Sequence, residues 1–293
     1  MRRREMNKKL IVICLALAVA AMSLPAQAQS QYGDRVLSDN PLSFWEFEDV
    51  SMANGAVCAD TMGVEPGWYR NANSQGVYPT PVQPVAGAVG QAAYFSGTNN
   101  GTGDFIDVND NSYYHSNRLE NSKNVTLEFM EKAIDMTDYP RLIQHENGTN
   151  KNYGIGSING DPANALLTVM GCSSTWYAWP PGLFDGNWRY VVVTYAFNDP
   201  NTTEKWYLDS VLQRTNTIAG SLTPPDTWSD LLFGAEGNQN YVWNGYKGAL
   251  DEVAIYNYVL SQAQITAHYN AIPEPATIAL LSLGGLALLR KRS

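Results

Sequence analysis

Short β-prone runs separated by turn residues fill most of the chain, and this pattern constrains the fold more than any other feature. The run "NWRYVVVTYAF" is apolar almost throughout, which is typical of a central strand buried on both faces. The run "SFWEFED" alternates instead, so Phe44 and Glu48 fall on one face and Trp45 on the other. The succession predicts an all-β fold, a sandwich or jelly roll of two antiparallel sheets.

One short helix is predicted at the end of this β region, in "LSQAQITAHYN". Ser261 can cap the helix, and Gln264 stands three residues later, which is the spacing of a capping box. Leu260 before the cap and Ile265 after it have the spacing of a hydrophobic staple. We therefore expect a short C-terminal helix that completes the fold.

Residues 1–28 have the organisation of a secretory signal peptide. Five basic residues precede an apolar run, and the small residues of "AQA" follow it. Export would bring Cys58 and Cys172 into an oxidising compartment. The sequence leaves two alternatives open: a disulfide between these cysteines, or two free thiols.

The last 22 residues form a second apolar segment with a different organisation. Residues 275–289 are uncharged, and a helix of this length spans about 22 Å, less than the ~30 Å hydrocarbon core of a bilayer. Three basic residues follow and would stay on the cytoplasmic side. The segment could cross a thinned bilayer only marginally.

Pro273, Glu274 and Pro275, the short apolar segment and the basic end resemble the PEP-CTERM sorting signal of Gram-negative bacteria. The resemblance covers residues 272–293. It implies processing by an exosortase-like enzyme and transient contact with the inner membrane. It also implies a final location at the cell surface or in an extracellular matrix. A plain C-terminal membrane anchor is the alternative, and whether the tail is cleaved stays open.

The charge of the region between these two ends is strongly negative. Without the eight basic residues of the ends, 11 Lys and Arg face 26 Asp and Glu, a net charge of about −15. Such a surface repels nucleic acid and other polyanions and suits divalent cations or neutral ligands. Solubility alone is an equally good explanation of the charge.

Motifs along residues 29–271 resemble, in order, a LamG-like domain of the concanavalin A-like lectin and glucanase type. They include "PLSFWEFED", "AGAVGQAAYFSG", "GNWRYVVVTY", "KWYLDS" and "GALDEVAIYNYVLSQAQITAHYN". The resemblance implies a jelly roll and a β-hairpin that turns at Asp209 and Ser210. The sequence departs from the family at Ser210, where a glycine is usual, and at Met130, where tryptophan is frequent.

No catalytic constellation is evident in the sequence. Retaining or inverting glycosidases need two carboxyl groups facing one another across a cleft. Glu128 and Glu131 are three apart and fall on opposite faces of a strand. The three histidines, His115, His145 and His268, are isolated and lack zinc spacing. We therefore predict that the protein is not an enzyme.

One structural Ca²⁺ is implied by the LamG resemblance, between the first and last strands. The candidate ligands are Glu48 or Asp49 near the first strand and Asp251 in "GALDEV". Asp251 alternates with Val253, so both are expected on one face. The alternative is an Asp251 that only accepts backbone hydrogen bonds.

Aromatic side chains in loops are the candidate sugar contacts, because pyranose faces stack on aromatic rings. The segment "SSTWYAWPPG" offers Trp176, Tyr177 and Trp179, and "NYVWNG" offers Trp243. Aromatic residues of β-sandwiches are more often part of the core. Trp188, at the start of the apolar strand, is expected in the core.

These observations predict an exported, non-catalytic protein that binds polysaccharide or a matrix glycan through a LamG-like domain. A glycoside hydrolase or lyase on the same fold is one alternative, and a purely structural biofilm matrix protein is the other. The glycan and the oligomeric state are not encoded in any recognisable pattern.

Overall fold

The computed structural model describes residues 31–73, 81–97, 102–108, 123–135, 139–146, 151–156, 166–170, 173–178, 180–220, 231–238 and 241–273. The predicted signal peptide lies outside these ranges, as do Cys172, His115 and all of the predicted sorting segment except Ile272 and Pro273. Within the part described, no helix is both long and apolar enough to cross a membrane.

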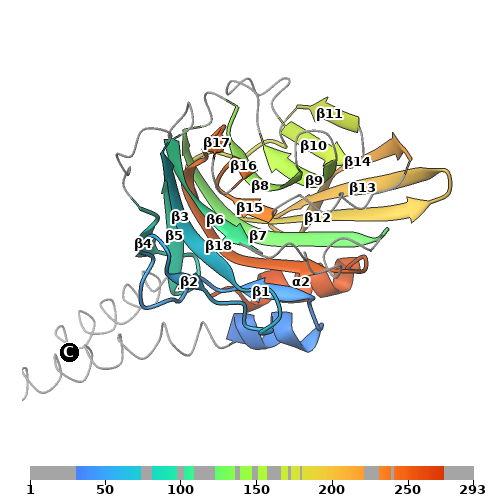
Figure 1. The fold of residues 1–293 in the computed structure, drawn as a ribbon. Helices are drawn as coiled ribbons and strands as arrows, with labels where there is room; N and C mark the ends of the chain where they lie inside the picture. The colour runs from blue at the N-terminus through green and yellow to red at the C-terminus, as the bar shows by residue number, and fades with distance from the viewer. Residues whose placement is uncertain are drawn as a thin grey trace, which may run out of the picture.

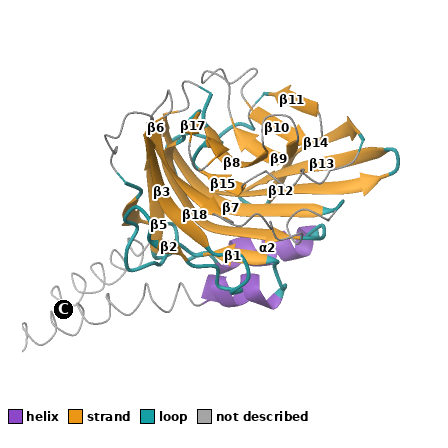
Figure 2. Cartoon of the chain, viewed as in Figure 1, coloured by secondary structure: helices purple, strands orange, loops and turns teal. Residues whose placement is uncertain are grey.

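Two eight-stranded antiparallel sheets form a sandwich (Figures 1 and 2). The first sheet contains, from one edge to the other, β14 (Val211–Ala219), β13 (Asn201–Leu208), β12 (Arg189–Asn198), β7 (Val125–Asp135), β18 (Lys247–Tyr256), β5 (Gln91–Ser96) and β4 (Gln83–Ala86). Its eighth strand, β1 (Ser43–Trp45), pairs with the far end of β18, beyond the part that pairs with β5.

The second sheet contains β11 (Ser173–Tyr177), β10 (Leu166–Met170), β9 (Lys151–Gly156), β8 (Arg141–Glu146), β15 (Leu231–Phe233), β6 (Thr102–Val108), β3 (Gly67–Asn73) and β2 (Val57–Cys58). A small ribbon of β16 (Glu236–Asn238) and β17 (Tyr241–Trp243) accompanies it. The all-β sandwich predicted from the sequence is confirmed.

The core lies between the sheets and follows the alternation read from the sequence. Trp45 and Phe47 point inward, and Trp45 meets Phe233 edge to face with ring centroids 5.1 Å apart. Phe44 belongs to a separate apolar cluster on the outer face of the first sheet. Gly234 is required where it stands, because its φ is +88° and a Cβ would lie 2.3 Å from the Phe95 ring.

Two helices cover the outer face of the first sheet (Figure 2). One is α2 (Gln262–Ala271), whose N-cap Ser261 and capping box with Gln264 confirm the prediction. The other spans residues 31–38 and buries Tyr32 and Val36, and the sequence pattern did not predict it.

The β13–β14 hairpin turns at Asp209 and Ser210, as predicted. Both turn residues have positive φ, 50° and 65°, which matches the twist of a two-residue hairpin. Cys58 is a buried free thiol on β2, and burial raises its pKa well above the ordinary value.

Candidate functional site

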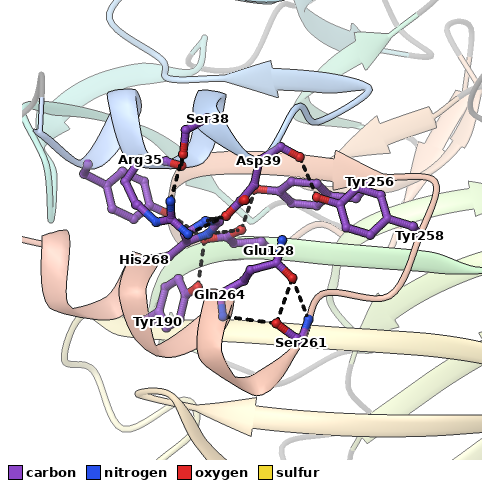
Figure 3. A network of polar contacts seen from close by, with 11 residues as sticks. Arg35, Ser38, Asp39, Glu128, Tyr190, Tyr256, Tyr258, Ser261, Gln264 and His268 are labelled. Carbon is purple, nitrogen blue, oxygen red and sulfur yellow. Dashed lines mark hydrogen bonds and ion pairs between the residues drawn. The ribbon is translucent and has the colours of Figure 1, made fainter.

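A buried carboxylate, Glu128 on β7, is the centre of a polar network beneath both helices (Figure 3). The hydroxyls of Tyr32, Tyr190 and Tyr256 donate to it at 2.8–2.9 Å. The Nδ1 atom of His268 lies 2.9 Å from the same carboxylate. The four partners come from the helix over 31–38, β12, β18 and α2, so a single side chain connects four elements to β7.

His268 extends this network to Asp39. Its Nε2 atom lies 2.8 Å from Asp39 Oδ2, and Arg35 donates to the same oxygen at 2.8 Å. An imidazole can donate from both nitrogens only when it is protonated. Burial, the largest single influence, lowers the pKa of His268, but the hydrogen bonds and charges of Glu128 and Asp39 outweigh it and raise this pKa above 6.5.

We call these side chains the Glu128 network. Its members are Tyr32, Arg35, Asp39, Glu128, Tyr190, Tyr256 and His268. The partners of Glu128 are between 62 and 140 positions away in the chain, so no local spacing in the sequence could have revealed them. The network places Arg35 and His268 beside Asp39 and Glu128, and its contacts join the two helices to the first sheet.

Glu131 lies on the opposite face of β7 from Glu128, as the spacing predicted. It is fully buried, and it accepts from the backbone N–H groups of Ala133 at 2.8 Å and Phe184 at 3.2 Å. Tyr246 donates to it at 3.3 Å. Burial is the main influence and raises the pKa of Glu131 to about 7. The two carboxylates of β7 therefore cannot face one another across a cleft.

Asp251 lies where a bulge interrupts β18. It pairs with Met130, which belongs to the outer cluster, whereas Val253 belongs to the core between the sheets. The expectation that Asp251 and Val253 share a face is wrong, because Glu252 adopts a φ of +53° and the register shifts between Asp251 and Ala254. Asp251 Oδ2 accepts from the N–H groups of Ala88 and Val89 at 2.9 and 3.0 Å.

The predicted calcium ligands are only partly brought together. The negative charge of Glu48 is among the causes that raise the pKa of buried Asp251, after burial itself, so the two carboxylates lie near one another. Asp49 has different neighbours: its carboxylate accepts from Tyr69 Oη at 2.7 Å and from Ala59 N.

Three carboxylate oxygens are buried near this bulge, and burial raises the pKa of both Asp251 and Glu252. Asp251 Oδ1 and both oxygens of Glu252 have no hydrogen-bond partner within the part of the chain that the structure describes. Hard oxygen donors of this kind suit Ca²⁺. The described residues do not, however, gather three acidic, His or Cys side chains at one point, so carbonyls or water would have to complete a coordination shell.

The predicted sugar-contacting residues lie at two places in the second half of the chain. Trp176 and Tyr177 are on β11, the edge strand of the second sheet, and Trp243 ends β17. Trp179 lies outside the described residues. Trp188 was expected in the core. It is instead half-buried beside an open pocket on the outer face of the first sheet.

Two family models match the sequence. One, described as the concanavalin A-like lectin/glucanases superfamily, matches residues 100–266. The other, described as the PEP-CTERM protein-sorting motif, matches residues 271–293 and indicates export and membrane-anchored sorting in a Gram-negative bacterium. A comparison with curated proteins finds no match.

Several solved structures share the fold. Domain 4 of AbnA, a GH43 extracellular arabinanase from Geobacillus stearothermophilus, in complex with arabinotriose, is 17% identical with a TM-score of 0.53, over 80% of this chain and 98% of that one. A botulinum neurotoxin type C structure concerned with two ganglioside molecules is 15% identical with a TM-score of 0.54, over 81% and 53%. The binding domain of botulinum neurotoxin DC in complex with rat synaptotagmin II is 15% identical with a TM-score of 0.52, over 80% and 52%. This chain therefore spans about half the length of the toxin chains, and the likeness is one of fold.

Proposed function

We propose, because this chain belongs to the concanavalin A-like lectin/glucanases superfamily, that it is an exported, non-catalytic protein that binds carbohydrate at the bacterial surface or in the surrounding matrix. The observation that carries the proposal is that one chain contains both a superfamily domain and a sorting motif. A superfamily sandwich is joined to a PEP-CTERM motif, and this motif indicates export and membrane-anchored sorting, which would bring the sandwich to the cell surface.

Two features support a carbohydrate ligand. The fold is shared with an arabinanase domain in complex with arabinotriose and with a toxin structure concerned with gangliosides. The excess of acidic residues also disfavours polyanionic partners such as nucleic acid. Fold likeness alone does not fix a ligand, so the glycan has to be found by experiment.

The non-catalytic part of the proposal rests on the carboxylates of β7. Glu128 is held by three tyrosine hydroxyls and His268, and Glu131 is buried on the other face. Neither is placed to act with the other on a glycosidic bond. A glycoside hydrolase or lyase and a purely structural matrix protein remain the competing functions.

We further propose that one structural Ca²⁺ binds near the β18 bulge. Asp251 and Glu48 would supply carboxylate oxygens, with Glu252 beside them, and Asp49 would not take part. The support is the set of buried carboxylate oxygens without partners on Asp251 and Glu252. The ion would neutralise a group of acidic side chains that burial otherwise penalises.

A glycan array probed with the full chain in a mild detergent tests the main proposal. It should carry neutral and uronic-acid oligosaccharides, arabinotriose among them, and be run with calcium and with chelator. Saturable binding to some glycan, without release of reducing ends from the corresponding polysaccharide, is expected. Turnover would favour the hydrolase, and a blank array with normal matrix retention would favour the purely structural protein.

A further inference from the structure

An open pocket of about 590 Å³ lies on the outer face of the first sheet, where α2 ends. Met130 on β7 and Tyr190 on β12 form its base, and both are buried. Its sides come from the turn between β4 and β5 at Gly87, the segment that precedes β12, the β13–β14 turn, and the end of α2 with the residues that follow it as far as Pro273. Its volume falls in the range of about 300–1,000 Å³ that small-molecule sites occupy.

Aromatic rings form two sides of the pocket. Trp188 is half-buried, and Tyr269 is 36% exposed. Tyr269 also leans on Tyr190, with ring centroids 5.8 Å apart and the planes tilted by 39°. A partly exposed ring that is fixed from behind offers a flat apolar surface, on which the C–H face of a sugar ring can stack while its hydroxyls stay hydrated.

The remaining side of the pocket is polar and carries no net positive charge. Arg189 donates to Asp209 at 2.9 Å and also binds Asp185. The hydrogen bond from Arg189 is the main reason that the pKa of Asp185 falls to about 2, so this carboxylate stays ionised at neutral pH. Asn270 is exposed at the edge and adds an amide. Hydroxyl groups find donors and acceptors here, whereas a ligand carboxylate would meet the Asp209 carboxylate and an Arg189 side chain that Asp209 and Asp185 already neutralise.

The Glu128 network supports the pocket through Tyr190 at its base and through α2. The Tyr190 hydroxyl donates to Glu128 at 2.8 Å, and His268, the neighbour of Tyr269 in α2, contacts the same carboxylate. Tyr190, and Tyr269 through its ring contact with Tyr190, are therefore positioned by the folded protein before any ligand arrives, which lowers the entropic cost of binding.

We propose that this pocket binds a neutral oligosaccharide, with Trp188 and Tyr269 stacking on the sugar and Arg189, Asp209 and Asn270 contacting its hydroxyls. This inference rests on the proposed carbohydrate-binding function and names its site and ligand class. It places the site on the first sheet, away from the loop residues that the sequence suggested.

The test is a binding titration of the full chain and four variants against the best-bound glycan of an array that carries neutral and uronic-acid oligosaccharides. Trp188→Ala should weaken binding by about tenfold or more. Asn270→Ala, at an exposed position, keeps the test valid if Trp188→Ala folds poorly, and it should weaken binding by about threefold. Trp68→Ala is the matched control, since Trp68 is half-buried on β3 of the other sheet.

Unchanged affinity of both Trp188→Ala and Asn270→Ala, with loss of binding in the fourth variant, Trp243→Ala, would overturn the inference and leave the proposed function standing. A preference for uronic-acid glycans would overturn the ligand class. Absence of binding to every glycan would overturn the inference together with the proposed function. Loss of affinity in Trp188→Ala and Asn270→Ala, with Trp68→Ala unaffected, supports it.

Discussion

At the scale of single residues, the two buried glutamates of β7 show how differently one strand can accommodate a carboxylate. Glu128 has four side-chain partners, one of them a histidine placed between two carboxylates. Glu131 accepts from two backbone N–H groups and a tyrosine hydroxyl, and burial is the main cause of its raised pKa. Because burial penalises the charged form, the folded protein binds a proton at Glu131 more tightly than the unfolded chain does.

Glu131→Gln should therefore change how stability depends on pH. The folded pKa of about 7 lies above the ordinary value of 4.5, so Glu131 contributes stability that is fully present below about pH 4.5 and is lost as pH rises towards 7. Urea unfolding between pH 4 and 8 should show this loss, of about 3 kcal/mol, in the wild type and not in the variant. Parallel curves for the two proteins across that window would contradict the assignment.

At the scale of elements, the β13–β14 hairpin contains a residue that its backbone does not favour. Ser210 has a φ of 65°, in the left-handed region that favours glycine. Ser210→Gly should stabilise the protein by about 0.5–1 kcal/mol, because it removes the strain of a Cβ at positive φ. Its backbone carbonyl still accepts from Gln262, so the contact with α2 is retained.

The matched control for the hairpin is Gly220→Ala. Gly220 has a φ of 92° and open space around its missing Cβ, so the substitution changes backbone strain without a clash. It should destabilise by about 1 kcal/mol, the opposite sign from Ser210→Gly. Thermal melts of both variants decide the matter, and a Ser210→Gly protein that melts lower than the wild type would show that the serine side chain has a role of its own.

What the sequence could predict depends on how local each signal is. The capping box of Ser261 and Gln264 lies within four residues, and α2 begins where it was expected. The helix over 31–38 lacks such a signal: it contains Gly33, and its buried residues Tyr32 and Val36 gain their partners from distant strands. The pocket beside Trp188 joins segments separated by up to 186 positions, so no spacing in the sequence announces it.

The proposed Ca²⁺ site at the β18 bulge can be tested with the substitution Asp251→Asn. A single oxygen of Asp251 accepts both N–H groups of the 88–89 turn, so Asp251→Asn can keep these bonds through its amide oxygen. It removes the charge and replaces the second oxygen, Oδ1, for which the described residues provide no hydrogen-bond partner. If Ca²⁺ binds only the folded protein, a hundredfold excess over Kd stabilises by about 2.7 kcal/mol and raises Tm by about 5–8 °C.

Asp251→Asn should abolish most of this calcium-dependent shift and leave Tm in chelator unchanged or higher. Asp49→Asn is the control, because the Asp49 carboxylate faces Tyr69 and Ala59, and its calcium shift should equal that of the wild type. Equal melting of the wild type in calcium and in chelator would show that no ion binds there. If Asp251→Asn lowers Tm relative to the wild type by the same amount in calcium and in chelator, Asp251 is a hydrogen-bond acceptor only.

At the scale of the whole molecule, the Glu128 network attaches both ends of the described chain to the middle of the first sheet. Asp39 follows the helix over 31–38, and His268 belongs to α2, 229 positions later. The His268 imidazole contacts Asp39 through Nε2 and Glu128, on β7, through Nδ1 (Figure 3). The position of the two helices therefore depends on His268. Because Tyr269 of α2 lines the pocket, the shape of the pocket depends on His268 as well.

His268→Gln should lower the free energy of unfolding by about 2–3 kcal/mol near pH 6, because it leaves Glu128 buried without its cation. The raised pKa of His268 determines how its contribution to the free energy of unfolding depends on pH. Its contribution is fully present below about pH 6.5, the ordinary value, and is lost as pH rises through the folded pKa. Unfolding measured from pH 5.5 to 9 should thus show the wild type and the variant converging at alkaline pH.

A double-mutant cycle with Glu128→Gln separates the ion pair from general packing. If the imidazolium and the carboxylate stabilise one another, the coupling between the two substitutions is large at pH 6 and shrinks at pH 9. The pKa of Asp39 shifts in the opposite sense: burial alone would raise it, but hydrogen bonds from Gln264 and His268 lower it, so its contribution is lost only in acid, below this window. A coupling that does not change between pH 6 and 9 would mean that His268 acts as a neutral packing residue, and the attachment of the two helices would then rest on the tyrosine hydroxyls alone.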